Sequence, residues 1–207
     1  MITTRLRDSI PRKIFKEKIR LASSDREKRL LYHKYLDEGR GSCLLKKPSI
    51  AEMVGEAIEF YDGKSYSLVE WVVMPNHIHF VYRLPQKPMG DIAGNIKSYT
   101  SNQINKLLDT SGTKNWKRDY FDRFARDEQH LVNMSCYTLL NPVKAGLVDD
   151  PFDWKWSSIH RYNKAYKKEL RKWYRRWKDR FWQSIAHEDE TEETERARLP
   201  GHDSRSR

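Results

Sequence analysis

The segment at residues 71–84, WVVMPNHIHFVYRL, has a pattern of apolar and polar positions around which we arrange the rest of the chain. Its first four residues are apolar and predict the end of a buried strand, and the Pro-Asn pair after them favours a turn into a second strand. Successive side chains of a strand point to opposite faces, so His77 and His79 share one face while Ile78 and Phe80 share the other. The pattern therefore predicts two imidazoles side by side at the mouth of a hairpin.

A His-x-His pair alone is compatible with two different sites. One is a metal site, and the other is a pair of half-buried histidines that hydrogen-bond on a sheet face. A third ligand would favour the metal site. The remaining histidines show no close ligand spacing and are His33, His130, His160, His187 and His202.

A polar helix further along the chain offers such a ligand. Residues 127–140, DEQHLVNMSCYTLL, begin with acidic residues, which the helix dipole favours in a first turn. Pro142 disfavours the helical conformation for the residue before it, so we expect the helix to end near Leu140 or Asn141. Tyr137 and Asn141 are one helical turn apart, so a phenol and an amide oxygen would point the same way.

Three motifs together resemble those of a known family. They are MPNHIH at residues 74–79, Tyr137-x-x-x-Asn141 followed by PVKAGLV, and WKWSS at residues 154–158. The chain, over about residues 3–162, resembles the REP-associated tyrosine transposases, which are relatives of the single-tyrosine HUH transposases. The resemblance implies that His77, His79 and Asn141 bind a divalent metal ion, Mg2+ or Mn2+, and that Tyr137 is the nucleophile.

The chemistry of a phosphodiester agrees with this set of residues. The phosphate is charged and its leaving group is poor, so an attacking tyrosine needs a cation that neutralises oxygens and aligns the phosphate for in-line displacement. Two imidazole nitrogens and one amide oxygen leave coordination positions open for the phosphate. Imidazole-rich ligation by itself fits Mn2+, Zn2+ or Ni2+ at least as well as Mg2+.

The composition favours a nucleic-acid partner. Forty Lys and Arg against 29 Asp and Glu give a formal net charge of +11, and the chain contains seven Trp and eleven Tyr. Cations pair with phosphates and aromatic rings stack on bases, although solubilising charge with core aromatics is the alternative. No apolar run is long enough to predict a membrane span or a signal peptide, so we expect a cytoplasmic protein. Cys43 and Cys136 are far apart and predict no disulfide.

The hydrophobic periodicity along the chain predicts an α+β fold in the order βαββαβα with an inserted helix. We expect strands at residues 1–6, 65–74, 77–84 and 116–125. A helical region is expected at residues 12–37, with a Ser24/Glu27 capping box. A second helix is expected from about residue 49, with a Ser49/Glu52 capping box and with Phe60 in its apolar stripe. A third is expected at residues 91–108, with Tyr99 and Leu107 pointing inward. This order suits an antiparallel sheet with helices packed against it. The resemblance adds that the sheet is ferredoxin-like, as in HUH endonucleases.

Three regions are predicted from composition and from the resemblance. Residues 1–160 would form the catalytic domain, with a helical insertion at about 12–40. Family members usually carry further residues before the first strand, so the resemblance predicts a shortened N-terminal strand. Residues 161–187 predict a basic aromatic helix, and residues 188–207 an acidic and then mixed-charge disordered tail.

Several basic residues are candidate DNA contacts. Lys97 lies on the polar face of the helix at residues 91–108, a face that would line a DNA strand or simply face water. The last strand would bring further arginines towards the tyrosine helix, and the basic helix would grip the phosphate backbone or else pack its aromatics on the domain. The remaining candidates are Arg118, Arg123, Arg126, Lys144, Arg171, Lys172, Arg175 and Arg176.

Three functions are compatible with these residues. The first is metal-dependent cleavage and rejoining of single-stranded DNA through a 5′-phosphotyrosine on Tyr137, and the resemblance implies that the DNA is a hairpin-forming repetitive element. The second is a non-catalytic protein that binds DNA hairpins. The third is a hydrolase that uses the histidines and a metal-bound water, which predicts cleavage that survives Tyr137→Phe.

Overall fold

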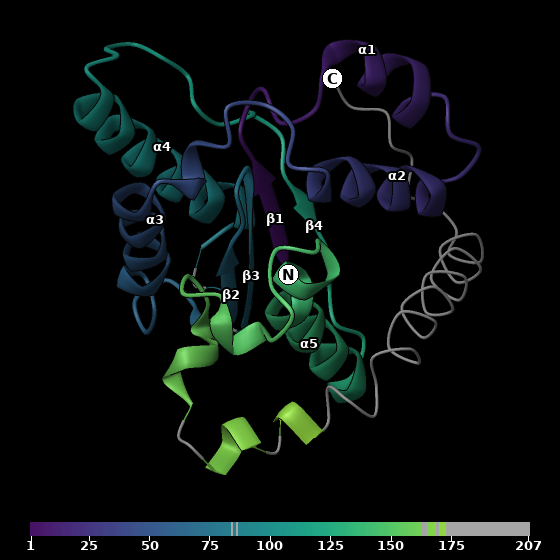
Figure 1. Cartoon of the computed structure of the whole chain (residues 1–207), viewed down its shortest axis with the longest axis vertical. Helices are drawn as coiled ribbons and strands as arrows, with labels where there is room; N and C mark the ends of the chain where they lie inside the picture. Colours follow the sequence, from purple (N-terminus) through teal and green to yellow (C-terminus); the bar gives the residue numbers. More distant parts are fainter. Residues whose placement is uncertain (84, 86, 163–164, 169, 173–207) are drawn as a thin grey trace.

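The computed structural model describes residues 1–83, 85, 87–162, 165–168 and 170–172. Its centre is an antiparallel sheet in the order β2-β3-β1-β4 (Figure 1). The strands are β1 Ile2–Arg5, β2 Ser67–Val73, β3 His77–Arg83 and β4 Phe121–Asp122. The α+β class, the antiparallel sheet and the βαββαβα order are therefore confirmed. β1 is short, but it pairs with β3 on one side and with β4 on the other.

The register of β1 and β3 divides the residues between two faces. Thr3 pairs with His79 and Arg5 pairs with His77, so these four polar side chains share one face. Ile2 pairs with Phe80, and Ile78 with Thr4, on the opposite face. The alternation of polar and apolar side chains that the sequence predicts for β3 is confirmed, and the paired residues of β1 share its two faces.

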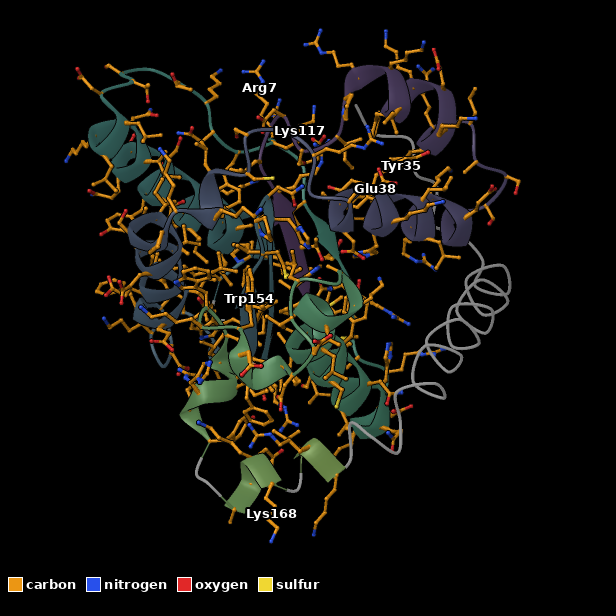
Figure 2. All side chains as sticks on the ribbon, viewed as in Figure 1. Arg7, Tyr35, Glu38, Lys117, Trp154 and Lys168 are labelled. Atoms are coloured by element: carbon orange, nitrogen blue, oxygen red, sulfur yellow. The ribbon has the colours of Figure 1, made fainter. Side chains whose placement is uncertain are left out.

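Helices α3 (Pro48–Phe60) and α4 (Met89–Leu108) cover the apolar face (Figure 1). Their apolar stripes pack with Ile2, Ile78 and Phe80 in the main core, and side chains fill the space between helices and sheet (Figure 2). The buried side of α4 includes Thr100 and Ile104.

Four expectations for these two helices are wrong. Phe60, Tyr99 and Leu107 are exposed by 61%, 48% and 56%, because each lies away from the buried stripe of its helix. The Ser49/Glu52 capping box is not formed either. Pro48 occupies the first helical turn and Lys47 is the N-cap, so the helix starts before Ser49 can cap it.

Helices α2 (Asp25–Asp37) and α5 (Glu128–Lys144) lie on the polar side of the sheet (Figure 1). A short helix α1 (Arg12–Ile14) and a π-helical turn (Phe15–Ile19) precede α2. The Ser24 side chain accepts a hydrogen bond from the Glu27 N–H, as the capping box predicts, while the Glu27 carboxylate accepts from Ser23. The helical segments in this part of the chain and the stop at Gly39, with a φ of 65°, are confirmed.

Two predicted boundaries on this side are wrong. α5 continues through Pro142 to Lys144, and Gly146 follows it with a φ of 66°. A proline near a helix C-terminus removes only one intrahelical N–H donor, and the remaining turn bonds form regardless. The last strand is shorter than expected, since Trp116 makes only an isolated bridge to Leu6.

The Trp-x-Trp-Ser-Ser motif closes the outer edge of β2. Trp154 Nε1 donates to the Val73 carbonyl at 2.9 Å, and Ser158 Oγ accepts from the Trp71 N–H at 2.9 Å. Short 3₁₀ turns at Leu44–Lys46, Pro151–Asp153 and Ser158–Arg161 complete the described fold. Most of the predicted basic helix and the whole predicted tail lie outside the described residues. Within the part that is described, no helix is both long and apolar enough to cross a membrane.

Candidate active site

Each histidine of β3 is held by a hydrogen bond to its Nδ1 atom. Thr3 Oγ1 lies 2.7 Å from His79 Nδ1, and Asn76 Oδ1 lies 2.7 Å from His77 Nδ1. The Asn76 amide nitrogen donates to the carbonyls of Leu36 and Arg40, so its oxygen must face His77. His77 Nδ1 is therefore the donor, and its Nε2 keeps a lone pair that can bind a cation.

Helix α5 brings Asn141 to the same place, as its spacing from Tyr137 predicts. The Asn141 amide nitrogen lies 3.3 Å from His79 Nε2. Asn141 Oδ1 and His77 Nε2 are buried without a hydrogen-bond partner among the described residues. A buried polar atom without a partner requires an explanation, such as an ion that occupies the site when it is bound.

The electrostatics keep both imidazoles neutral. His77, His79 and Asn141 are 0% exposed. Burial lowers the pKa of His77 to about 3 and that of His79 well below its ordinary value, since a buried charge is poorly solvated. Among the described residues, no group of three or more His, Cys, Asp and Glu side chains could by itself hold a metal ion.

Tyr137 lies beside this cluster on α5 and is only 7% exposed. Its ring centroid is 5.6 Å from that of His79, nearly perpendicular to it. Its hydroxyl lies 3.1 Å from His33 Nδ1 and accepts a hydrogen bond from Lys144 Nζ at 3.3 Å. Burial raises the pKa of the Tyr137 phenol, and the Lys144 ammonium opposes this increase.

Two residues of α2 that were not expected at the site complete it. His33 packs against both His79 and Tyr137, with ring centroids 5.6 Å from each. Asp37, one turn later, forms an ion pair with Lys144 at 3.1 Å. Their spacing of four residues places them on one helix face, but that spacing alone does not indicate which part of the sheet the face covers.

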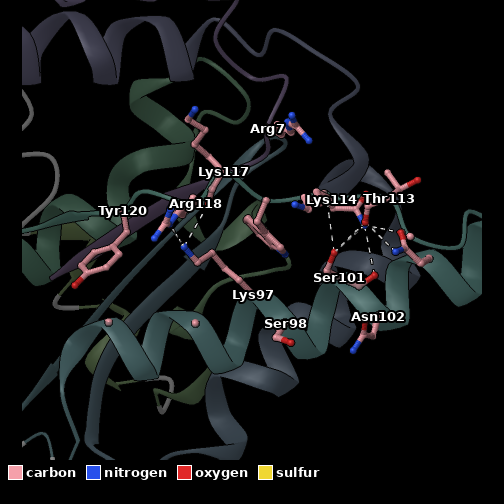
Figure 3. A pocket seen from close by; sticks show the side chains of 16 residues that line it. Arg7, Lys97, Ser98, Ser101, Asn102, Thr113, Lys114, Lys117, Arg118 and Tyr120 are labelled. Carbon is pink, nitrogen blue, oxygen red and sulfur yellow. Dashed lines mark hydrogen bonds between the residues drawn. The ribbon is translucent and has the colours of Figure 1, made fainter. Parts of the chain in front are cut away.

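Two of the candidate DNA contacts lie in a groove along α4 (Figure 3). The groove has a volume of about 830 Å3, and its basic side chains include Lys97, Lys117, Arg118 and Arg7. Lys97 Nζ donates to the carbonyls of Lys117 and Arg118 at 3.2 and 2.6 Å, so it holds the groove wall in place. The polar face of α4 predicted from the sequence therefore lines an open groove, which is separate from the Tyr137 cluster.

The other candidate DNA contacts are in several different places. Lys144 lies against Tyr137, and Arg126 is exposed just before α5. The Arg123 backbone pairs with Met1 beside β4. Arg171 Nε contacts Asp150 at 2.9 Å, and Lys172 beside it is exposed. Arg175 and Arg176 lie outside the described residues.

Comparisons with known proteins identify transposases that are similar to this chain. The family model for IS200-like transposases matches residues 39–134, which include both histidines of the site and end before Tyr137. The chain is 31% identical over 112 residues to a Haemophilus influenzae protein named as a candidate REP-associated tyrosine transposase, and 28% identical over 99 residues to one from Escherichia coli. The chain is similar to the REP-associated tyrosine transposases. These matches cover 48% and 47% of the chain, and it spans 62% and 57% of the two relatives.

A solved structure of a REP-associated tyrosine transposase bound to a REP hairpin has the same fold. It matches with a TM-score of 0.52 and 20% sequence identity, over 77% of this chain and 75% of the other. The two curated relatives confirm the resemblance to the REP-associated tyrosine transposases that the motifs indicated, and this solved structure confirms the fold. The ligand and nucleophile roles of individual residues stay predictions.

Proposed function

We propose that this protein cleaves and transfers single-stranded DNA in a metal-dependent reaction, through a 5′-phosphotyrosine on Tyr137, at hairpin-forming repetitive elements. The observation that carries the proposal is the convergence of Tyr137 with His77, His79 and Asn141 on one buried face. The similarity to transposases supports the choice of DNA as the substrate.

His77, His79 and Asn141 fit a divalent cation and would hold it through two Nε2 atoms and one amide oxygen. His77 Nε2 and Asn141 Oδ1 support this fit, because both are buried and unpartnered in the described structure. We propose Mg2+ or Mn2+, of which Mn2+ accepts imidazole ligands more readily. When bound, such an ion would neutralise the non-bridging phosphate oxygens and orient the phosphate.

The residues of the chain then perform the transfer. As Tyr137 Oη forms a bond to phosphorus, the bond from phosphorus to the 3′ oxygen breaks. The phenol loses one proton and the departing oxygen gains one, which yields a free 3′-hydroxyl and a 5′-phosphotyrosine. Because the new ester conserves the bond energy, a 3′-hydroxyl can attack it and rejoin DNA without ATP.

Hairpin DNA is the proposed partner. A related structure contains a REP hairpin, and the chain carries a formal net charge of +11. The groove along α4 offers basic residues for phosphates and Tyr120 for stacking, which suits an extended strand (Figure 3). We propose that Lys97 and Arg118 act there, and that Arg123, Arg126, Arg171 and Lys172 contribute outside it. The DNA contacts predicted for Arg175 and Arg176 concern residues beyond the described part of the chain.

Denaturing gels test this proposal directly. Hairpin oligonucleotides with a randomised single-stranded flank and a 3′ label are incubated with protein and Mn2+ or Mg2+. We expect labelled DNA that migrates with the protein, and no such band with chelator or with Tyr137→Phe. Hairpin binding without an adduct would instead indicate a DNA-binding protein, and cleavage by Tyr137→Phe would indicate a hydrolase.

A further inference from the structure

Helix α2 is attached to the sheet on the face that carries the two histidines. The amide of Asn76, in the turn between β2 and β3, donates to the carbonyls of Leu36, in the last turn of α2, and of Arg40, just after the helix. Tyr32 also packs on Phe121 of β4, with ring centroids 4.1 Å apart. The helix is therefore fixed over the polar face of the sheet.

The contacts at the Tyr137 hydroxyl have a defined direction. Lys144 Nζ has no acceptor lone pair, so it must donate to Tyr137 Oη, at 3.3 Å. The phenol hydrogen is then left to donate to His33 Nδ1, at 3.1 Å. Asp37 Oδ2 receives Lys144 on its other side, at 3.1 Å. Two residues of α2 and one of α5 thus fix the position of the phenol oxygen.

We propose that α2 completes the reaction centre: Asp37 positions Lys144, and the Lys144 ammonium stabilises negative charge on Tyr137 Oη during attack and during rejoining. This inference rests on the proposed function. Tyr137 Oη becomes partly anionic when it attacks phosphorus, and again when it leaves in the reverse step. A fixed cation at that oxygen therefore lowers both barriers in a site that water reaches poorly.

The burial and charge of the two side chains support these roles. The side chains of Lys144 and Asp37 are exposed by 27% and 13%, so their ion pair is largely shielded from solvent. Burial lowers the pKa of Lys144, but Tyr137 and Asp37 raise it by more, so the net shift favours the ammonium form. No proton needs to leave Lys144 for either step.

This role differs from the DNA contact expected for Lys144 from its sequence. A lysine that binds the phosphate backbone is normally exposed and contributes to affinity and to its salt dependence. Lys144 instead has a carboxylate partner, and its ammonium lies 5.0 Å from the centroid of the Tyr137 ring. The geometry therefore assigns Lys144 to the rate of transfer and not to DNA affinity.

The first experiment measures affinity and rate separately with the full chain. Fluorescence anisotropy gives the affinity for the labelled hairpin, and single-turnover assays at saturating DNA give the rates of adduct formation and of rejoining. We expect Lys144→Met to slow both rates by about 10²-fold, with affinity within about twofold. Lys144→Arg, which keeps the charge, should recover much of the rate.

The second experiment tests whether Asp37 acts through Lys144. We expect Asp37→Asn to slow the reaction by about tenfold, a cost typical of removing an orienting partner, and to have no further effect in the Lys144→Met background. The matched control is Glu38→Gln at Glu38, which is the C-cap of the same helix (Figure 2). Glu38 pairs with Arg40 and has no ion pair or hydrogen bond with Lys144 in the described structure. The control should react at the wild-type rate.

Three results would overturn the inference. Wild-type rates in both Lys144→Met and Asp37→Asn would remove the role of the pair while leaving the proposed function intact. A loss of affinity by Lys144→Met, with an unchanged rate at saturating DNA, would make Lys144 a phosphate contact. Failure of the wild-type protein to form any adduct would overturn the proposed function and this inference with it.

Discussion

The two faces of the sheet are equally buried but chemically different. His77 and His79 point to one face and Ile78 and Phe80 to the other, and all four are 0% exposed. Ile78 and Phe80 pack in a core that excludes water beneath α3 and α4. The histidines instead face α2 and α5, where His79 contacts His33 and Tyr137.

This difference shows how one short strand can support both stability and chemistry. Burying an apolar side chain is favourable wherever it packs well, whereas a buried imidazole needs a partner for each ring nitrogen. Asn76 and Thr3 satisfy the Nδ1 atoms. The Nε2 atom of His77 remains unpartnered among the described residues, as does Asn141 Oδ1. The apolar face therefore stabilises a fold whose polar face keeps two buried polar atoms without a partner in the described structure.

The largest effect on stability is expected on the apolar face. Phe80→Ala should lower the free energy of unfolding by about 3–5 kcal/mol, because it leaves a cavity in the core. The matched control is Phe60→Ala, since Phe60 is 61% exposed, and it should cost no more than about 0.5 kcal/mol. Urea unfolding followed by circular dichroism measures both. Equal costs for the two variants would contradict the placement of the core.

A somewhat smaller effect is expected from metal on the polar face. At a concentration about 100 times its Kd, Mn2+ should stabilise the wild-type protein by about 2.7 kcal/mol, because it binds only the folded state. His77→Ala should abolish this stabilisation by Mn2+. The control His160→Ala changes a histidine on the Ser158–Arg161 turn and should keep it. Thermal unfolding with and without Mn2+ decides the result, and stabilisation that survives His77→Ala would contradict the proposed ligand set.

The pH dependence of stability also distinguishes the two faces. In the folded protein the pKa of His77 is lowered to about 3, so the unfolded chain binds more protons below pH 6.5 and stability falls as pH decreases. From pH 7.5 to 5.5, in the presence of chelator, one such histidine should cost about 1.4 kcal/mol. His77→Gln should therefore lose less stability than the wild type over this range. Parallel curves for the two proteins would contradict the burial of a neutral imidazole.

The smallest effect is expected where the sequence interpretation was wrong. Tyr99 was expected in the core, but it is 48% exposed on the outer face of α4. Tyr99→Ser should therefore change the free energy of unfolding by no more than about 0.5 kcal/mol. Chemical denaturation measures this difference. A cost near that of Phe80→Ala would restore the inward orientation of Tyr99.

Much of the fold could be predicted because local patterns determine it. The alternation in β3, the turn at Pro75-Asn76 and the apolar stripes of the helices indicate which residues share a face. The ends of the helices and strands were less predictable. Pro142 lies inside α5, and β4 has only two residues, because these limits depend on tertiary contacts and not on local propensity.

The candidate site could be predicted only in part, for a similar reason. The motifs indicate His77, His79, Tyr137 and Asn141, and the structure brings all four together. His33 and Asp37 carry no such motif, and their place at the site depends on how α2 docks on the sheet. That docking is determined by Asn76 and by contacts distant in sequence, which no local pattern indicates.

The most direct test of the account is to locate the DNA on the protein. The adduct formed with hairpin DNA and Mn2+ is digested with nuclease and protease, and the peptides are sequenced by tandem mass spectrometry. We predict a residual 5′-phosphonucleotide on Tyr137, on the same face as His77 and His79. A nucleotide on Tyr99 or Tyr120, or an adduct that forms with Tyr137→Phe, would contradict the assignment of the polar face as the active site.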